Sequence, residues 1–163
     1  MGMIDLIKLL DQAKADYVLV GGLAVALHGY ARNTMDVDIV LAMNADNIQR
    51  FIGAAKAAGL QPVAPVSIES LAKPELLEQW VREKGLLAFA LRGADSQSTV
   101  LDVLIKSPVS FETLRQDAEL VGLGAMKIPV ASIDHLIAMK RDTGRSKDAV
   151  DIDELQKLKA KKA

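Results

Sequence analysis

An acidic–apolar–acidic triplet opens the most strand-like stretch of the chain and constrains the fold more than any other feature. Asp36 and Asp38 stand one residue apart in a run that is otherwise apolar as far as Leu41. A strand turns residues i and i+2 to the same side, so both carboxylates would face one way while Val37 and Ile39 face a core. Two carboxylates this close repel each other unless a positive charge lies between them. A divalent cation is the usual positive charge, and phosphate chemistry is the usual reason for it.

The composition is typical of a single domain with an aliphatic core. The chain has 163 residues, of which 50% are hydrophobic and only 4% are aromatic. Its 20 basic and 21 acidic residues give a formal net charge of −1. No global positive field therefore favours nucleic acid or an anionic membrane surface, and affinity for a polyanion would have to come from a local patch.

The chain contains no cysteine, which excludes disulfides, thiolate zinc sites and a cysteine nucleophile. Its first residues do not form a basic segment followed by an apolar one, so no secretory signal is visible. The most apolar stretch, 17–27, is too short to span a bilayer and is split by two glycines. We therefore expect a soluble, cytoplasmic protein without membrane contact.

Hydrophobic periodicity and turn residues predict alternating helices and strands. We expect helices over 4–13, 23–27, 44–58, 67–84 with a second piece from Pro74, 111–116, 132–139 and from Ser146 onward. We expect strands over 17–20, 36–41, 86–91, 99–105, 119–121 and 126–130, with 61–66 a loop or short edge strand. A single domain over 1–163 would comprise a core of about 1–108 and a C-terminal strand and helix portion of about 109–163.

Three features line up in chain order and together indicate a metal and phosphate site. The pair Gly21-Gly22 ends an apolar run, where glycine lets a ligand approach the backbone and the following helix offers free N–H groups to an anion. Asp36 and Asp38 follow. Asp102 is the only charged residue in the run 100–105, and a lone aspartate in a buried strand is costly unless it is paired, hydrogen-bonded or bound to metal.

Each feature has an ordinary structural explanation when it is taken alone. The glycine pair is then a strand-to-helix turn, the two aspartates are a solvated strand face, and Asp102 is the partner of an arginine. Their order and spacing favour the interpretation as a site, with three carboxylates for one or two Mg²⁺ ions. Such a site does not guarantee activity.

These residues resemble the signature of the nucleotidyltransferase (polymerase-beta-like) superfamily. That signature is an apolar residue, Gly, Gly or Ser, a gap, and then an acidic–apolar–acidic triplet. Here Val20-Gly21-Gly22 is followed by thirteen residues and Asp36-Val37-Asp38, and Asp102 fits the third carboxylate on a later strand. Segments 32–38 and 140–151 resemble the Arg-x-Thr-x-Asp-x-Asp and Lys…Gly-Arg-x-Lys-Asp-x-x-Asp forms of small bacterial AbiEii-like toxin members.

The resemblance implies an α+β nucleotidyltransferase fold: a mixed β-sheet flanked by helices, with a small C-terminal helical portion. It implies transfer of a nucleoside monophosphate from a nucleoside triphosphate to a hydroxyl of an RNA, a protein or a small molecule, with Mg²⁺ or Mn²⁺ as cofactor. By position, the catalytic and metal-binding residues would be Asp36, Asp38 and Asp102. The nucleotide-binding residues would be Gly21, Gly22, Arg32, Thr34, Lys140 and Arg145.

Two departures from the pattern leave alternatives open. Gly22 stands where many catalytic members carry a serine that contacts phosphate, which favours an inactive nucleotide-binding or protein-interaction module with the same fold. The stretch 59–84 matches no motif, and we expect it to shape the acceptor site. The toxin resemblance implies a tRNA or protein acceptor and an antitoxin partner; a small-molecule adenylyltransferase acting on a drug hydroxyl is a third hypothesis.

Other polar side chains are expected to be structural. Asp148 and Asp151 lie three residues apart on one helical face and are expected to pair with nearby basic side chains. His28 is expected to be packed or hydrogen-bonded, and His135 to be exposed. A solvated, fraying helix end is expected for the terminal lysines Lys157, Lys159, Lys161 and Lys162.

Overall fold

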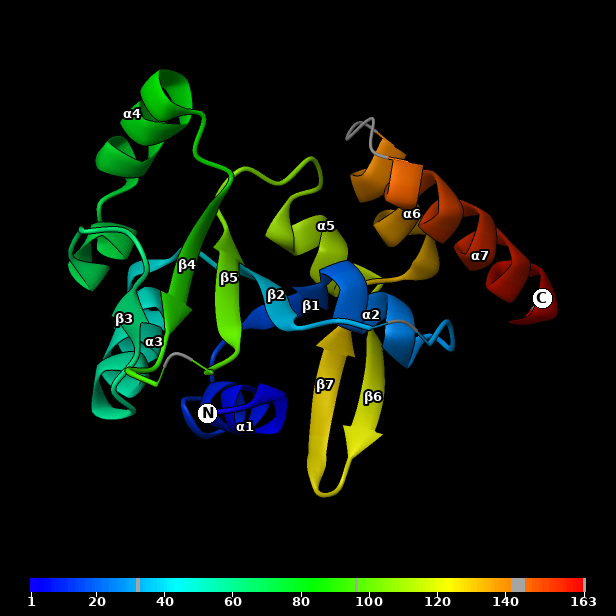
Figure 1. Cartoon of the computed structure of the whole chain (residues 1–163), viewed down its shortest axis with the longest axis horizontal. Coiled ribbons are helices and arrows are strands. Elements are labelled where there is room, and N and C mark those ends of the chain that lie inside the picture. Colours follow the sequence, from blue (N-terminus) through cyan, green and yellow to red (C-terminus); the bar gives the residue numbers. More distant parts are fainter. Residues whose placement is uncertain (32, 96, 142–145, 163) are drawn as a thin grey trace.

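A mixed β-sheet lies at the centre of the folded molecule (Figure 1). The computed structural model describes residues 1–31, 33–95, 97–141 and 146–162. Its strands are β1 (Tyr17–Val20), β2 (Asp36–Leu41), β3 (Gln61–Pro62), β4 (Ala88–Arg92), β5 (Val100–Leu104), β6 (Glu119–Leu123) and β7 (Met126–Val130). The order across the sheet is β3-β4-β5-β2-β1-β7-β6, with β2–β5 and β1–β7 parallel and the other pairs antiparallel. The predicted α+β architecture with a mixed sheet is confirmed.

Helices cover the sheet and extend beyond it on both sides. They are α1 (Met3–Gln12), α2 (Gly21–Leu27), α3 (Ala45–Ala57), the 3₁₀ helix η1 (Ile68–Ala72), α4 (Pro74–Lys84), α5 (Phe111–Gln116), α6 (Ile133–Arg141) and α7 (Ser146–Lys162). Figure 1 shows α4 above β4 at one end of the molecule, with α6 and α7 side by side at the other. Among the helices in the described part of the chain, none is long and apolar enough to cross a bilayer.

The element boundaries follow the turn chemistry closely. Pro74 opens α4, as expected for a residue without a backbone N–H in the first helical turn. The helix predicted over 23–27 begins two residues earlier, at Gly21, because Gly21 itself makes the turn out of β1 with φ +72°. The two portions predicted on either side of residue 108 share one sheet, since β7 pairs with β1.

One face of β2 and β5 lies in the core. Val37 and Ile39 of β2 and Leu101 and Val103 of β5 are completely buried, as is Phe51 of α3. Strand geometry turns the alternate residues of β2 and β5 to the opposite face, where the carboxylates stand. The apolar face thus holds both strands in place and leaves the acidic face free for chemistry.

A buried amide that the sequence pattern did not single out ties α3 to the sheet. The Asn47 side chain is inaccessible to solvent. It donates to the carbonyl oxygens of Asp16 at 2.9 Å and Ala42 at 2.8 Å, and accepts from the Asp16 N–H at 2.7 Å. Asn44, the N-cap residue of α3, accepts from the Asn47 N–H at 2.9 Å. These bonds connect the start of β1, the end of β2 and the first turn of α3.

Replacing this amide should be costly because its partners would stay buried without it. We expect Asn47→Ala to lower the free energy of unfolding by about 2–4 kcal/mol, measured by urea denaturation. Asn33→Ala, at an exposed position, is the matched control and should change stability by less than about 0.5 kcal/mol. Equal effects of the two substitutions would contradict the role assigned to Asn47.

Candidate active site

Two of the three predicted carboxylates stand side by side. β2 and β5 are parallel and in register, with Asp36 opposite Val100 and Asp38 opposite Asp102. Register partners on neighbouring strands point to the same face of a sheet, so Asp38 and Asp102 share the face opposite the core. Both are half-buried. Residues 64 positions apart in the sequence are thereby placed within interaction range of each other.

The electrostatics of the pair reflect shared negative charge. Burial, and then the charge of Asp102, raise the pKa of Asp38 from 3.8 to about 7, and only Lys140 acts in the opposite direction. Burial also raises the pKa of Asp102, the charge of Asp36 adds to this, and a hydrogen bond from Asp38 lowers it. In the absence of a cation, burial and the neighbouring carboxylates therefore favour the protonated form of this pair.

Asp36 stands apart from this pair. It lies two residues before Asp38 on the same strand face, and its side chain is exposed. Its charge acts on both other carboxyl groups. Over residues 1–31, 33–95, 97–141 and 146–162, no three His, Cys, Asp or Glu side chains are already arranged around a common metal position. The three-carboxylate metal site stays a prediction, with Asp38 and Asp102 as its assembled part.

Gly21 lies directly against Asp38. A Cβ atom built on Gly21 would stand 2.0 Å from Asp38 Oδ2 and 2.9 Å from Asp38 Cβ, which no side chain can occupy. The φ of +72° adds a second reason for glycine at this position. The sequence motif therefore has a local steric basis: the glycine allows the turn into α2 to pass over the carboxylate.

Of the other residues predicted to bind nucleotide, three lie in the described part of the chain. Gly22 follows in the first turn of α2, and the Thr34 hydroxyl donates to the Asp36 carbonyl oxygen at 3.4 Å. Lys140, on α6, is close enough to lower the pKa of Asp38. The predictions for Arg32 and Arg145 lie outside the described residues.

Lys140 belongs to a buried ionic cluster. Its ammonium lies 3.2 Å from Asp148 Oδ1 and 2.9 Å from Asp151 Oδ2 on α7, and both carboxylate side chains are almost fully buried. The predicted pairing of the two aspartates with a basic residue is confirmed. The lysine and the two carboxylates hold one another in place, because separating them would leave charged groups uncompensated and shielded from solvent. These ion pairs join α7 to α6.

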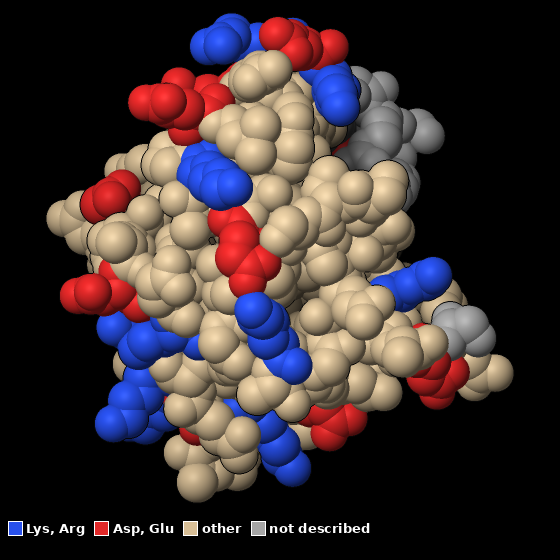
Figure 2. Space-filling model, turned by 90° about the vertical axis from the view of Figure 1, so that its left-hand side faces the viewer, with Lys and Arg blue, Asp and Glu red and all other residues tan. Residues whose placement is uncertain are grey.

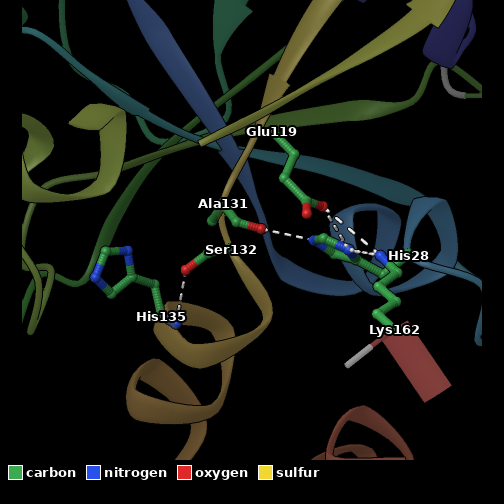
Figure 3. Close-up of polar contacts among 6 residues, drawn as sticks. All are labelled: His28, Glu119, Ala131, Ser132, His135 and Lys162. Carbon is green, nitrogen blue, oxygen red and sulfur yellow. Dashed lines mark hydrogen bonds and ion pairs between the residues drawn. The ribbon is translucent and has the colours of Figure 1, made fainter. Parts of the chain in front are cut away.

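The other end of α2 is held by the buried imidazole of His28 (Figure 3). Its Nε2 donates to the Ala131 carbonyl oxygen at 2.8 Å, just after β7, which leaves Nδ1 to accept from the Lys162 ammonium at 3.1 Å. Glu119 Oε2 on β6 lies 3.2 Å from the same Nδ1 and 3.7 Å from Lys162 Nζ. The prediction of a hydrogen-bonded His28 is confirmed, and strands and helices from the C-terminal portion hold the helix that begins at Gly21.

One sequence prediction in this region is wrong. His135 is not exposed: its side chain is only 16% accessible, and its Nε2 lies 3.7 Å from Asp117 Oδ2, just after α5. The terminal lysines are exposed, as predicted, but two of them also contact other elements. Lys162 reaches His28, and Lys159 pairs with Asp134 at 2.6 Å, because α7 runs alongside α6. Neither contact has a short-range signal in the sequence, since each joins residues far apart along the chain.

Comparison with solved structures identifies the architecture. No family model and no curated protein sequence matches the chain. The lincosamide antibiotic adenylyltransferase LnuA, with lincomycin bound, superposes with a TM-score of 0.60 at 18% identity, over 96% of this chain and 95% of that one. The chain has the nucleotidyltransferase fold. An antigenic nucleotidyltransferase-like protein from Paracoccidioides brasiliensis superposes with a TM-score of 0.55 at 18% identity, over 94% of this chain and 71% of that one. ANT(2")-Ia in complex with adenylyl-2"-tobramycin superposes with a TM-score of 0.53 at 12% identity, over 94% of this chain and 90% of that one.

The contact between Gly21 and Asp38 generates a stability prediction for this nucleotidyltransferase fold. We expect Gly21→Ala to lower the free energy of unfolding by more than about 2 kcal/mol, through its positive φ and the overlap with Asp38. Gly53→Ala is the matched control, because Gly53 lies inside α3 with open space around it. The control should gain about 0.5–1 kcal/mol from helix propensity. A neutral Gly21→Ala would contradict the steric contact.

The raised pKa of Asp38 predicts a distinctive pH dependence. Because its folded-state value lies above 3.8, the contribution of Asp38 to stability is complete below about pH 4 and is lost as the pH rises through 7. In metal-free buffer we expect Asp38→Asn to match the wild type near pH 4 and to exceed it by about 4 kcal/mol at pH 8. Thermal unfolding at both pH values, with Glu78→Gln as an exposed control, measures this. A constant difference between the curves would show that the carboxyl is not perturbed.

Proposed function

We propose that this protein transfers a nucleoside monophosphate from a nucleoside triphosphate to a hydroxyl group of a small molecule. The single observation that carries the proposal is the register of Asp38 with Asp102, which places two carboxyl groups together beside the Gly21 turn. The fold supports it, because LnuA and ANT(2")-Ia share that fold over nearly the whole of both chains. The first of these structures holds lincomycin and the second holds adenylyl-2"-tobramycin, which are small molecules.

The reaction requires little covalent chemistry from the protein. The acceptor oxygen attacks the α-phosphorus, a new O–P bond forms, and the bond to the β-phosphate oxygen breaks, with its electron pair leaving on pyrophosphate. The proton of the acceptor hydroxyl passes to the Asp102 carboxylate. A carboxyl whose pKa is raised by burial is a better proton acceptor than an ordinary aspartate, which suits this role.

The donor set fits a hard divalent cation. Asp38 and Asp102 supply adjacent carboxylate oxygens, and Asp36 supplies a further one from the same strand face. These residues would hold Mg²⁺ or Mn²⁺. Such an ion, when bound, neutralises triphosphate charge and polarises the phosphoryl group. Burial of the Asp38 carboxyl, and then the charge of Asp102, raise its pKa, and a bound cation would relieve both effects.

The nucleotide would lie on the α2 side of the carboxylates. Gly21 and Gly22 leave the backbone open there, and Lys140, which also pairs with Asp148 and Asp151, is close enough to Asp38 to lower its pKa. Thr34 stands beside Asp36. Contacts from these residues to phosphate are part of the proposal, as are those from Arg32 and Arg145.

The other acceptors suggested by the sequence have less support. No observation in the described structure favours the toxin role, a tRNA or protein acceptor, or an antitoxin, which stay predictions from the motif resemblance. The alternative of an inactive binding module rests on Gly22. It is separated from an enzyme by showing whether triphosphate that binds is also consumed.

The direct test is transfer of label from α-labelled triphosphates. With Mg²⁺ or Mn²⁺, we expect wild-type protein to label a hydroxyl acceptor from a pool of neutral glycosides, lincosamides and aminoglycosides and to release pyrophosphate. Asp102→Asn should reduce the rate by about 10²–10⁴-fold, as expected for loss of a general base. The exposed control Asp46→Asn should keep the wild-type rate.

Two outcomes would count against the proposal. Triphosphate binding by calorimetry without any labelled product from the four nucleotides would support the inactive module. Full activity in Asp102→Asn would show that the register of β2 and β5 is not where the chemistry occurs.

A further inference from the structure

An apolar cavity of about 420 Å³ opens at the β4 edge of the sheet. Its wall is built from α4, from the start of β4 and from the segment 62–66 that follows β3. A volume of roughly 300–1,000 Å³ is typical of sites for small organic molecules. Figure 2 shows this side of the molecule, where charged residues of both signs stand apart between broad uncharged areas. The cavity is therefore a candidate for a small ligand and not for an extended polyanion.

The cavity adjoins the carboxylate pair through the strand register. Ala90 of β4 stands opposite Asp102 of β5, and Ala88 stands opposite Leu104. Register partners point to the same face, so the two alanines lie on the face that carries Asp38 and Asp102. Neighbouring strands are about 4.8 Å apart, and alanine side chains put no bulk between the cavity and Asp102. A molecule bound in the cavity would extend toward Asp102 across a single strand.

The chemistry of the wall restricts what can bind. Most of the lining is aliphatic or aromatic, including Pro62, Pro65 and the half-buried Trp80. Lys84 is the one ionisable residue among those that line the cavity, and its ammonium stands 5.9 Å from the centre of the Trp80 ring. Positive charge at the rim disfavours a polycation and tolerates a neutral or anionic molecule.

We infer that this cavity binds the apolar body of the acceptor, and that the acceptor is an uncharged or anionic hydroxyl compound, such as an aryl glycoside, and not a polycationic aminosugar. The inference rests on the proposed function for the meaning of "acceptor". The cavity itself is tested by binding alone. The segment 59–84, which matches no sequence motif, supplies most of its wall.

Binding can be followed through Trp80, the only tryptophan of the chain. The probe is 8-anilinonaphthalene-1-sulfonate, an anionic aromatic dye that accepts energy from tryptophan. We expect one dye per protein with energy transfer from Trp80. Ala88→Leu, which fills the cavity without touching Asp102, should weaken binding at least tenfold. Ala57→Leu, at an exposed position on α3, is the matched control and should bind like the wild type.

A second pair of variants keeps the inference testable if Ala88→Leu does not fold. Lys84→Glu reverses the charge at an exposed position on the rim and should weaken binding of the anionic dye at least threefold. Lys8→Glu makes the same change at an exposed position on α1, away from the cavity, and should have no effect. Melting temperatures of all four variants show whether each is folded.

Competition then identifies the class of acceptor. We expect 1-naphthyl β-D-glucoside to displace the dye and tobramycin to leave it bound. The inference is overturned if neither compound displaces the dye, if tobramycin displaces it as well as the glucoside does, or if a folded Ala88→Leu binds the dye like the wild type. None of these measurements needs triphosphate, so failure of nucleotidyl transfer would leave this result standing.

Where transfer is observed, Ala88→Leu should raise the KM for the acceptor at least tenfold and leave the KM for the triphosphate unchanged. An unchanged acceptor KM in the folded variant would overturn the cavity assignment while leaving the transfer reaction itself intact.

Discussion

The candidate site is assembled by the parallel register between β2 and β5. This register places Asp38 opposite Asp102, so two acidic groups from distant parts of the chain occupy one partly buried position. Burial first, and then the charge of Asp102, raise the pKa of Asp38, so the ionised pair opposes folding in the absence of a cation. The opposite faces of the same strands are completely buried, and that hydrophobic burial offsets the electrostatic cost. Local destabilisation supported by a strong core is what a functional site requires.

Contacts from the C-terminal portion support the candidate site. β7 pairs with β1, and the carbonyl after β7 accepts from His28 at the end of α2. From α7, Lys162 contacts the same imidazole, and Asp148 and Asp151 are the buried partners of Lys140. The short helix that starts at Gly21 is therefore restrained at both ends. A turn that must pass over a carboxylate with no room for a Cβ atom needs such support.

The carboxylate pair has two different neighbourhoods. On one side lie the Gly21 turn, with its open backbone, and Lys140, whose ammonium pairs with Asp148 and Asp151. On the other side β4 presents Ala90 and then an apolar cavity lined in part by Trp80. Under the proposed function, the nucleotide and the acceptor would approach the carboxylate pair from these two directions. This division suits an enzyme that joins a nucleotide to a hydroxyl compound.

Most of the local structure could be predicted from the sequence, which also indicated the candidate site. Periodicity and turn residues located the helices and strands, because which face of an element is apolar depends only on neighbours along the chain. The spacing of Asp36 and Asp38, the glycine pair and the isolated Asp102 indicated the site for the same reason. Which carboxylates meet could not be predicted in this way, because the register of two strands 64 residues apart depends on the packing of the whole sheet. The tertiary structure also decided the burial of Asn47 and His135, the path of α7, and the cavity formed by 59–84. Those features arise from contacts between distant segments, and such contacts leave no periodic signal in any one of them.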